Sequence, residues 1–351
     1  MLKMGSKLRY IIKLFALSSV ISLVIAIPLF WYLFQQYLQE PLSLEDDLLF
    51  TVPANSNLYA VTQELGLSGY LKYPRLLVWH ARWKEQTNIQ TGEYLFQVGA
   101  TPLDLLEQLN NGKVVQHSIT LIEGRTFREL LDSIHSDSRV SPTLAGKSDA
   151  EIVQALELEI SHLEGWFYPD TYMFSRGTTD AMLLKRAHAR MQDVLAEEWV
   201  SRDVGLPFET SYEALILASI VEKETGVARE RPEIAGVFSR RLQRGMRLQT
   251  DPTVIYGLGP EFDGNLTRRH LAKSTPYNTY RINGLPPTPI AAAGREAINA
   301  VLHPAAGSAL YFVARGDGSH EFSDTLEQHN TAVRKYQIEQ RATDYRSSPA
   351  E

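Results

Sequence analysis

Residues 210–257 carry the pattern that decides the fold, and they read TSYEALILASIVEKETGVARERPEIAGVFSRRLQRGMRLQTDPTVIYG. Thr210 and Glu213 have the T-x-x-E spacing of a capping box, in which each side chain satisfies a backbone N–H group at the start of a helix. Residues 215–221 are apolar on nearly every side, so the helix is predicted to be buried rather than amphipathic. Gly226 is a natural helix terminator, and the buried central helix is expected to end just before it.

Two acidic residues, Glu222 and Glu224, occupy the last turn of this predicted helix. A carboxyl group at the end of a buried helix is costly unless it is paired, hydrogen-bonded or protonated. A carboxylic acid that stays protonated near neutral pH is what general acid catalysis requires; the alternative is that both acids are solvated or salt-bridged. Residues two apart do not face the same way, so at most one points into a given site, and the helical pattern leaves both open.

The composition is that of an ordinary folded chain of 351 residues, 44% hydrophobic and 22% charged, which is enough for a membrane anchor and two modest domains. The net charge of −6 argues against a nucleic-acid partner. The absence of cysteine excludes a disulfide and a thiol nucleophile, and it suits an oxidising compartment. Because no histidines stand at i, i+4 spacing and no nucleotide-binding or zinc-protease motif is present, neither a metal nor a cofactor is expected.

Residues 14–34 form an uncharged stretch, LFALSSVISLVIAIPLFWYLF, long enough to cross a bilayer as a helix. Basic residues precede it and acidic residues follow it, so the positive-inside rule places residues 1–13 in the cytoplasm and the rest of the chain outside. A cleaved signal peptide is the competing interpretation. A retained single-pass anchor is favoured, because the apolar run is long and bulky residues rather than an A-x-A site end it.

Residues 41–160 are predicted to form a first outer domain of small α+β type. The period-2 and helical patterns predict strands at 48–52, 93–98 and 114–122, and helices at 57–65, 73–83, 101–109 and 126–134. The order of a strand, two short helices and a strand resembles a LysM-type carbohydrate-binding module. Basic residues of the second helix, Arg75, Arg82 and Lys84, are expected to form a solvated face.

Residues 161–340 are predicted to form a second, mixed α+β domain, followed by a polar tail at 341–351. Helices are expected at 178–199, 231–244 and 325–336, and another begins at Pro252 with Thr250 or Asp251 as its cap. A hairpin is expected from the segments 310–314 and 321–323. The fold class is therefore α+β, with one N-terminal transmembrane helix, a LysM-like module and a second domain built on the buried helix.

Several long strings in this second domain occur in the order that is typical of one family. They are LEGWFYPDTY, ASIVEKETGVARERPEIAGVFSRRL, GMRLQTDPTVIYGLG, YNTYRINGLPPTPI and HPAAGSALYFVARGDGSHEFSDTLEQHN. With these strings the chain resembles the YceG-like endolytic murein transglycosylases, most strongly over residues 163–336. The resemblance implies an enzyme of the bacterial inner membrane whose catalytic part, 161–340, lies in the periplasm. It also implies internal, non-hydrolytic cleavage of the MurNAc–GlcNAc β-1,4 bond of peptidoglycan, leaving 1,6-anhydroMurNAc ends.

The resemblance further implies that the essential acid is the first glutamate of the E-K-E-T string, Glu222. A single protonated carboxyl suffices for a lytic reaction, because the carboxylate left after proton donation can activate the sugar's own C6 hydroxyl in place of water. Other polar and aromatic residues are candidates for glycan contacts or for orienting the acid; they are Glu164, Asp170, Gln249, Thr250, Asp251, Tyr277, Asn278 and Tyr280.

Two other functions stay open at this point. One is a peptidoglycan hydrolase that uses two carboxylates, and the other is a membrane-tethered, non-catalytic glycan-binding scaffold for cell-wall synthases. The implied partners are peptidoglycan strands, the inner membrane through residues 14–34, and peptidoglycan synthases through a role in ending nascent strands.

Overall fold

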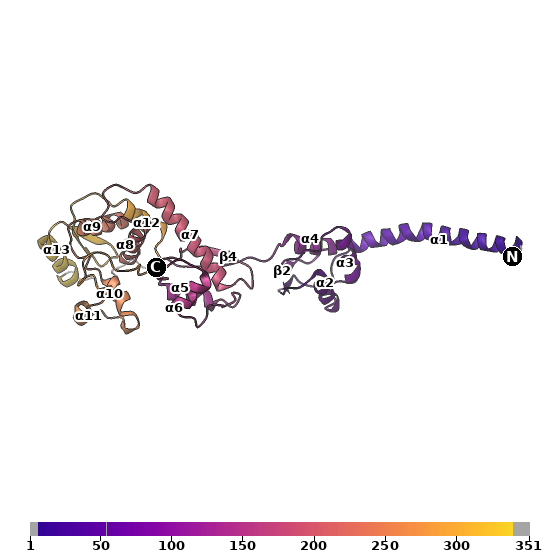
Figure 1. Cartoon of the computed structure of the whole chain (residues 1–351), viewed down its shortest axis with the longest axis horizontal. Coiled ribbons are helices and arrows are strands. Elements are labelled where there is room, and N and C mark those ends of the chain that lie inside the picture. The colour runs from indigo at the N-terminus through magenta and orange to yellow at the C-terminus, as the bar shows by residue number, and fades with distance from the viewer. Residues whose placement is uncertain (1–5, 54, 340–351) are drawn as a thin grey trace. The chain divides into compact units, whose positions relative to one another are not determined.

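The computed structural model describes residues 6–53 and 55–339 (Figure 1). The chain forms two compact units, Met1–His117 and Ser118–Glu351. The domain boundary predicted near residue 160 falls inside the second unit, because apolar side chains between 119 and 156 share one core with side chains between 163 and 187. The predicted polar tail, 341–351, lies outside the described residues.

The first unit is a long helix followed by a small α+β domain. Its elements are α1 (Ser6–Gln39), β1 (Leu48–Val52), α2 (Leu58–Leu67), α3 (Pro74–Trp83), β2 (Gly92–Phe96) and α4 (Pro102–Asn111). Within the described residues, α1 supplies one segment, Tyr10–Gln39, that is long and apolar enough to cross a membrane. Its final turn is different in character, because Phe34, Tyr37 and Leu38 are buried in the core of the domain.

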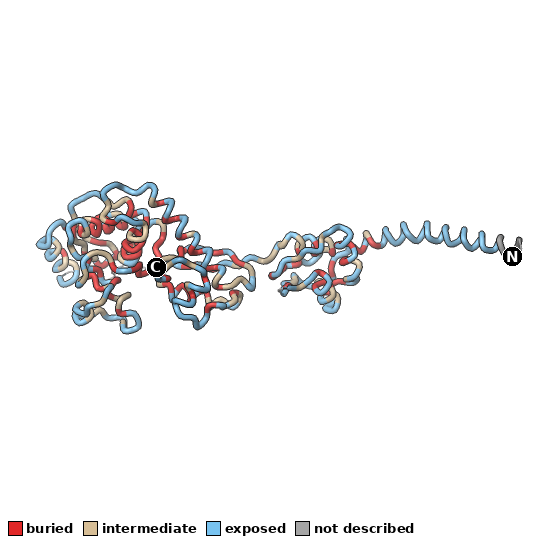
Figure 2. Tube along the Cα trace, viewed as in Figure 1, coloured by how far each residue is buried: buried red, intermediate tan, exposed pale blue. Residues whose placement is uncertain are grey.

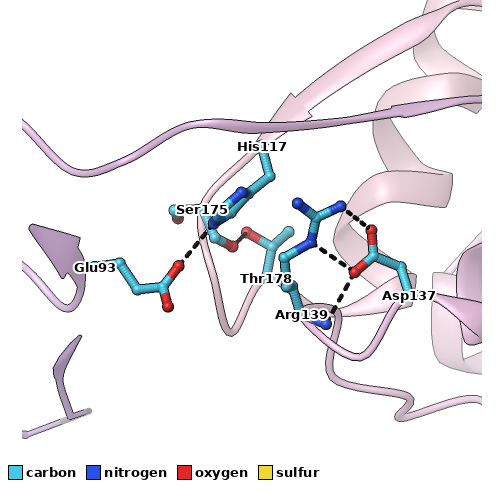
Figure 3. Close-up of polar contacts among 6 residues, drawn as sticks. All are labelled: Glu93, His117, Asp137, Arg139, Ser175 and Thr178. Atoms are coloured by element: carbon cyan, nitrogen blue, oxygen red, sulfur yellow. Dashed lines mark hydrogen bonds and ion pairs between the residues drawn. The ribbon is translucent and has the colours of Figure 1, made fainter. Parts of the chain in front are cut away.

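The predicted order of a strand, two helices and a strand is confirmed in this unit. β1 and β2 pair antiparallel from Leu48 opposite Phe96 to Val52 opposite Gly92, and Tyr94 and Phe96 are fully buried beneath α2, α3 and α4. Near the start of β2, the buried Glu93 carboxylate lies 2.7 Å from Nε2 of His117, the last residue of this unit (Figure 3). The resemblance to a LysM module stays a prediction.

The second unit contains more helix than sheet. Its elements are β3 (His117–Thr120, which starts at the boundary), α5 (Phe127–Ser136), α6 (Asp149–Leu156), β4 (Thr171–Phe174), α7 (Asp180–Val200), α8 (Ser211–Glu224), η1 (Ala228–Glu230), α9 (Arg231–Gln243), α10 (Asp251–Leu258), η2 (Gly259–Glu261), α11 (Arg268–Ala272), α12 (Arg295–Leu302), β5 (Tyr311–Ala314), β6 (His320–Ser323), α13 (Leu326–Val333) and the π-helical η3 (Arg334–Glu339). The predicted hairpin is confirmed by the antiparallel β5–β6 pair.

Helix α8 is the centre of this unit, as its sequence predicts. The Thr210–Glu213 capping box is present, and every residue from 214 to 221 is buried (Figure 2). Helices α7, α9 and α12 pack around it. Residues 214–221 are thus covered on all sides, and the charged residues of α8 lie at its two ends, with Glu213 in the first turn and Glu222, Lys223 and Glu224 in the last.

Local polar contacts fix the turns around β4. The Arg139 guanidinium binds the Asp137 carboxylate through Nε at 2.8 Å and Nη2 at 2.6 Å, and the Thr178 hydroxyl donates to the Ser175 carbonyl at 2.7 Å (Figure 3). The two turns are also joined to each other, because the backbone N–H of Gly177 donates to the Arg139 carbonyl at 3.0 Å.

Candidate active site

A cavity of about 1500 Å³ opens in the second unit beside the last turn of α8. This volume exceeds that of a typical small-molecule pocket, so the space suits a chain of several linked units. Polar and aromatic side chains from the segment before β4, from α8, from α10 and the residues just before it, and from the segment after α11 line one part; they are Glu164, Glu224, Gln249, Thr250, Asp251, Tyr256, Tyr277 and Tyr280. Residues of α9, β5 and α13 line the rest, including Arg241, Tyr311 and His329.

Glu224 places its carboxyl in this cavity. It is the last residue of α8, and its Oε1 accepts a hydrogen bond from the hydroxyl of Thr250. Burial raises the pKa of Glu224 to about 7, and the negative charge of Asp251 acts in the same direction, while the Thr250 hydrogen bond and the Arg241 charge oppose the rise. Near neutral pH this group therefore exists in both protonation states, as a residue that donates and then accepts a proton must.

Thr250 reaches Glu224 because the chain before α10 is held in an unusual conformation. Gln249 has a positive φ of 54°, which a non-glycine residue adopts only when its surroundings fix it. The hydroxyl of Thr279 accepts the backbone N–H of Thr250 at 3.0 Å and also lies 2.8 Å from the hydroxyl of Thr253. Thr250 is the N-cap residue of α10, but its side chain makes no capping bond and bonds Glu224 instead. Of the two residues predicted as the cap, Thr250 is the N-cap residue, but its side chain does not cap the helix.

Glu164 brings a second carboxyl into the cavity. Its Oε1 accepts the backbone N–H of Phe127 at 2.9 Å, and its Oε2 accepts the hydroxyl of Tyr256 at 3.1 Å. Burial raises the pKa of Glu164 to about 7 against these hydrogen bonds. The next residue, Gly165, has φ 79°, and a Cβ there would meet Pro289 at 2.4 Å, so this turn requires glycine.

Aromatic side chains and a buried arginine complete the walls. The Tyr256 and Tyr277 rings meet edge to face at 4.9 Å, and the Tyr280 hydroxyl donates to Asp251 at 2.7 Å. Arg241 is buried, donates through Nε to the Leu310 carbonyl at 2.6 Å, and places its charge 5.0 Å from the Tyr311 ring. Flat apolar faces beside fixed polar groups match the two kinds of surface on a sugar ring.

Glu222 lies outside the lining of this cavity. Its side chain is 6% exposed, its Oε1 lies 3.4 Å from Nη2 of the buried Arg231, and its Oε2 accepts the backbone N–H of Gly294 at 3.0 Å. Gly294 is the N-cap residue of α12, so Glu222 ties the end of α8 to the start of α12. The expectation that this carboxyl opens onto a substrate channel does not agree with this geometry, because both oxygens are engaged by fixed partners away from the cavity.

The structure brings most of the other predicted site residues together around the cavity. Glu164, Gln249, Thr250, Asp251, Tyr277 and Tyr280 all line the cavity, whereas Asp170 and Asn278 do not. The exposed Asp170 side chain accepts the N–H of Thr171 at the turn before β4. Asn278 is fully buried, and its amide donates to the Lys273 carbonyl at 2.6 Å, so its geometry fits a structural role.

Sequence reasoning did not select Glu224, Tyr256 or Arg241. Tyr256 follows Pro252 by four residues, so helical spacing places both on one face of α10, next to the candidate Asp251. This spacing could have identified Tyr256 from the sequence. The sequence could not identify Arg241, because a basic residue within a helix is expected to be solvated unless its carbonyl partners are known.

Replacing Thr250 with valine is expected to move the pH dependence of the reaction. The hydroxyl stabilises the Glu224 carboxylate, so its loss raises the pKa of Glu224 further above about 7. Activity that needs the protonated acid falls as pH rises through that pKa, and the alkaline limb of the pH–rate profile therefore shifts to higher pH. Thr253→Val is the control for disturbance of the backbone at Thr250, since its hydroxyl bonds the Thr250 carbonyl and Thr279 but not the acid; an unshifted limb in Thr250→Val would contradict the assignment.

Comparison with known proteins places these residues in a family. The model of the YceG-like family matches residues 50–335. A protein of Bacillus subtilis named endolytic murein transglycosylase is 29% identical over 87% of this chain and 89% of its own length. A Streptococcus pneumoniae protein of the same name is 26% identical over 81% of this chain, which spans 57% of that relative. A solved structure of a yceG-like protein from Listeria monocytogenes is 27% identical and matches 82% of this chain and 99% of its own, with a TM-score of 0.47.

Proposed function

This chain belongs to the YceG-like family, and from that membership we propose that it is an endolytic peptidoglycan transglycosylase with Glu224 as its general acid. The observation that carries the assignment of the acid is the position of Glu224, a carboxyl with a pKa of about 7 in a cavity large enough for a glycan strand. The names of the relatives support the substrate class, because the Bacillus subtilis and Streptococcus pneumoniae proteins are both endolytic murein transglycosylases.

The proposed reaction needs one carboxyl used twice. Protonated Glu224 gives its proton to the bridging oxygen, which leaves as the O4 hydroxyl of GlcNAc while the bond to MurNAc C1 breaks. The Glu224 carboxylate then takes the proton of the MurNAc C6 hydroxyl, whose oxygen bonds C1. The products are a 1,6-anhydroMurNAc end and a free GlcNAc end, and Glu224 is protonated again. The reaction consumes no water.

The neighbours of Glu224 support both halves of this cycle. The Thr250 hydroxyl and the Arg241 charge stabilise the carboxylate that follows proton donation, whereas burial and Asp251 favour the protonated form that starts the cycle. Glu164, Gln249 and the tyrosines at 277 and 280 are proposed to contact the glycan. Their partners in the protein hold them in place before substrate arrives, which is the arrangement that favours an internal attack over capture of water.

A two-carboxylate hydrolase is the second candidate, and the observation that favours it is Glu164. This carboxyl lies in the same cavity and has a similarly raised pKa, so it is a potential partner for Glu224 in the paired mechanism. Against it, both Glu164 oxygens accept hydrogen bonds from Phe127 and Tyr256, which leaves this carboxyl a weaker base toward water. The scaffold function has no comparable support, because a binding surface needs no carboxyl of raised pKa.

We propose that α1 anchors the enzyme in the inner membrane, with the N-terminus in the cytoplasm and both units after it in the periplasm. Its uncharged segment and the basic residues that precede it support this orientation. A membrane-held enzyme that cuts inside glycan strands is suited to terminating nascent strands beside peptidoglycan synthases, and that role is part of the proposal.

The products of digestion are expected to separate the two candidate enzymes. Wild-type protein incubated with purified sacculi should release fragments that end in 1,6-anhydroMurNAc, each lighter by one water than the hydrolytic product. Mass spectrometry of the soluble fragments is the measurement. Reducing MurNAc ends without anhydro sugar would support the hydrolase and contradict the lytic reaction, while an absence of any cutting by the wild type would favour the scaffold.

A further inference from the structure

Helix α3 exposes two tryptophans on one stripe of its surface. Trp79 is 47% exposed and Trp83 is 57% exposed, and their rings stack at 6.5 Å with an angle of 9° between the planes. Arg75 and Arg82 lie at helical spacing on the same stripe and are also exposed. An exposed pair of large aromatic side chains flanked by arginines is unusual for a solvated helix face, so the solvated face predicted from the sequence does not account for it.

The position of this stripe relative to α1 indicates what covers it. Trp31, near the end of the apolar segment of α1, meets the Trp83 ring edge to face at 5.8 Å. One turn later the buried Phe34 meets Trp79 at 5.3 Å. Helix α1 continues without a break from its apolar segment into the core of the domain, and Figure 1 shows α3 beside its end. The two tryptophans of α3 therefore lie beside the C-terminal end of the apolar segment of α1.

We propose that the Arg75–Trp79–Arg82–Trp83 stripe of α3 is a second membrane contact, seated in the headgroup layer of the bilayer that α1 crosses. This inference rests on the proposed anchor. Tryptophan prefers the membrane–water interface, where its ring contacts lipid and its N–H group contacts water. Arginines beside it can reach the phosphates of anionic lipids. Lys84, whose ammonium lies 4.8 Å from the Trp83 ring, adds a third cation next to the stripe.

The continuity of the stripe with α1 favours lipid over another protein as its occupant. A protein partner would have to approach α3 at the depth where α1 leaves the bilayer, and the headgroups already fill that level. An anchor helix and an interfacial helix fixed to each other by ring contacts restrict the tilt of the domain, because a single helix alone leaves tilt free. The first unit is thus expected to lie against the membrane surface rather than swing above it.

Single-tryptophan variants of the full-length chain test this contact. The chain has five tryptophans, and keeping one at a time while changing the others to phenylalanine gives reporters at positions 31, 79 and 83. A Thr51→Trp variant of the tryptophan-free chain is the control, because Thr51 is exposed on β1, whose partner β2 lies on the side of the unit away from α1 (Figure 1). Each protein is reconstituted in vesicles of phosphatidylethanolamine and phosphatidylglycerol that carry bromine just below the ester groups.

The reporters at 79 and 83 are expected to lose about half or more of their emission in brominated vesicles, as at 31, while the control keeps its emission. Quenching at 31 without quenching at 79 and 83 would overturn the inference and leave the anchor intact; the absence of quenching at all three positions would overturn both. Quenching of the Thr51→Trp control as well would contradict the claim that only the α3 side of the unit contacts the membrane.

A second readout does not depend on the multiple tryptophan substitutions. Because the natural chain has no cysteine, Trp83→Cys and Thr51→Cys each introduce a single thiol. A membrane-impermeant maleimide is expected to label both variants in detergent but only Thr51→Cys in vesicles. Equal labelling of both variants in vesicles would contradict the contact.

Discussion

Replacing Glu224 with glutamine is expected to lower the rate of glycan cutting by about a thousandfold, since general acid–base catalysis contributes factors of about 10² to 10⁴. Glutamine keeps the shape of the side chain and can still accept the Thr250 hydrogen bond, but it has no acidic proton to give to the bridging oxygen. The measurement is the initial rate of release of soluble fragments from sacculi, with substrate binding measured separately by sedimentation with the insoluble polymer.

Glu222→Gln is the matched control, because it makes the same chemical change two residues away in the same helical turn. Its partners are Arg231 and the N–H of Gly294 rather than the cavity, so the variant is expected to stay within about tenfold of the wild-type rate, below the range for loss of a general acid. A thousandfold loss in Glu222→Gln together with a nearly active Glu224→Gln would reverse the assignment and restore the acid implied by the sequence resemblance.

Replacing Arg231 with methionine is expected to lower the free energy of unfolding by about 3 kcal/mol or more, because it leaves the Glu222 carboxylate buried without its cation. The two side chains are only 10% and 6% exposed, so solvent screens this pair little. Arg231 also binds the exposed Glu296, but that carboxylate can return to water. The measurement is the urea midpoint of the full-length protein in detergent.

The Glu222→Gln/Arg231→Met double variant tests whether this loss comes from the stranded charge. Once Glu222 is neutral, the loss of its cation costs less, so the double variant should be more stable than Arg231→Met alone. Additive losses would show that the pair does not couple, and the structural role given to Glu222 would then lose its support.

Local patterns predicted the elements of the fold because each was decided by nearby residues. The capping box at Thr210, the alternation in β2 and the apolar surface of α8 all specify structure within a few positions. The domain boundary was missed because the residues before 160 show no local break that would reveal which core they join. Their apolar side chains pack on residues such as Phe167 and Leu183, and this pairing is a tertiary property.

The sequence pattern left the choice between the two acids open for a related reason. The helical pattern established that Glu222 and Glu224 face different ways, and the structure confirms this separation. What each one faces depends on Gly294 and Thr250, which lie 72 and 26 positions away in the chain. The resemblance implies the first glutamate of the E-K-E-T string, but it cannot by itself supply those contacts.

A crystal structure of Glu224→Gln with a bound peptidoglycan fragment would test the central assignment most directly. The account predicts that the glycan lies in the cavity, with the bridging oxygen of one MurNAc–GlcNAc bond within hydrogen-bond distance of the side-chain amide at position 224. It would be contradicted by a strand whose bridging oxygens lie against Glu222, or by a strand bound elsewhere on the second unit.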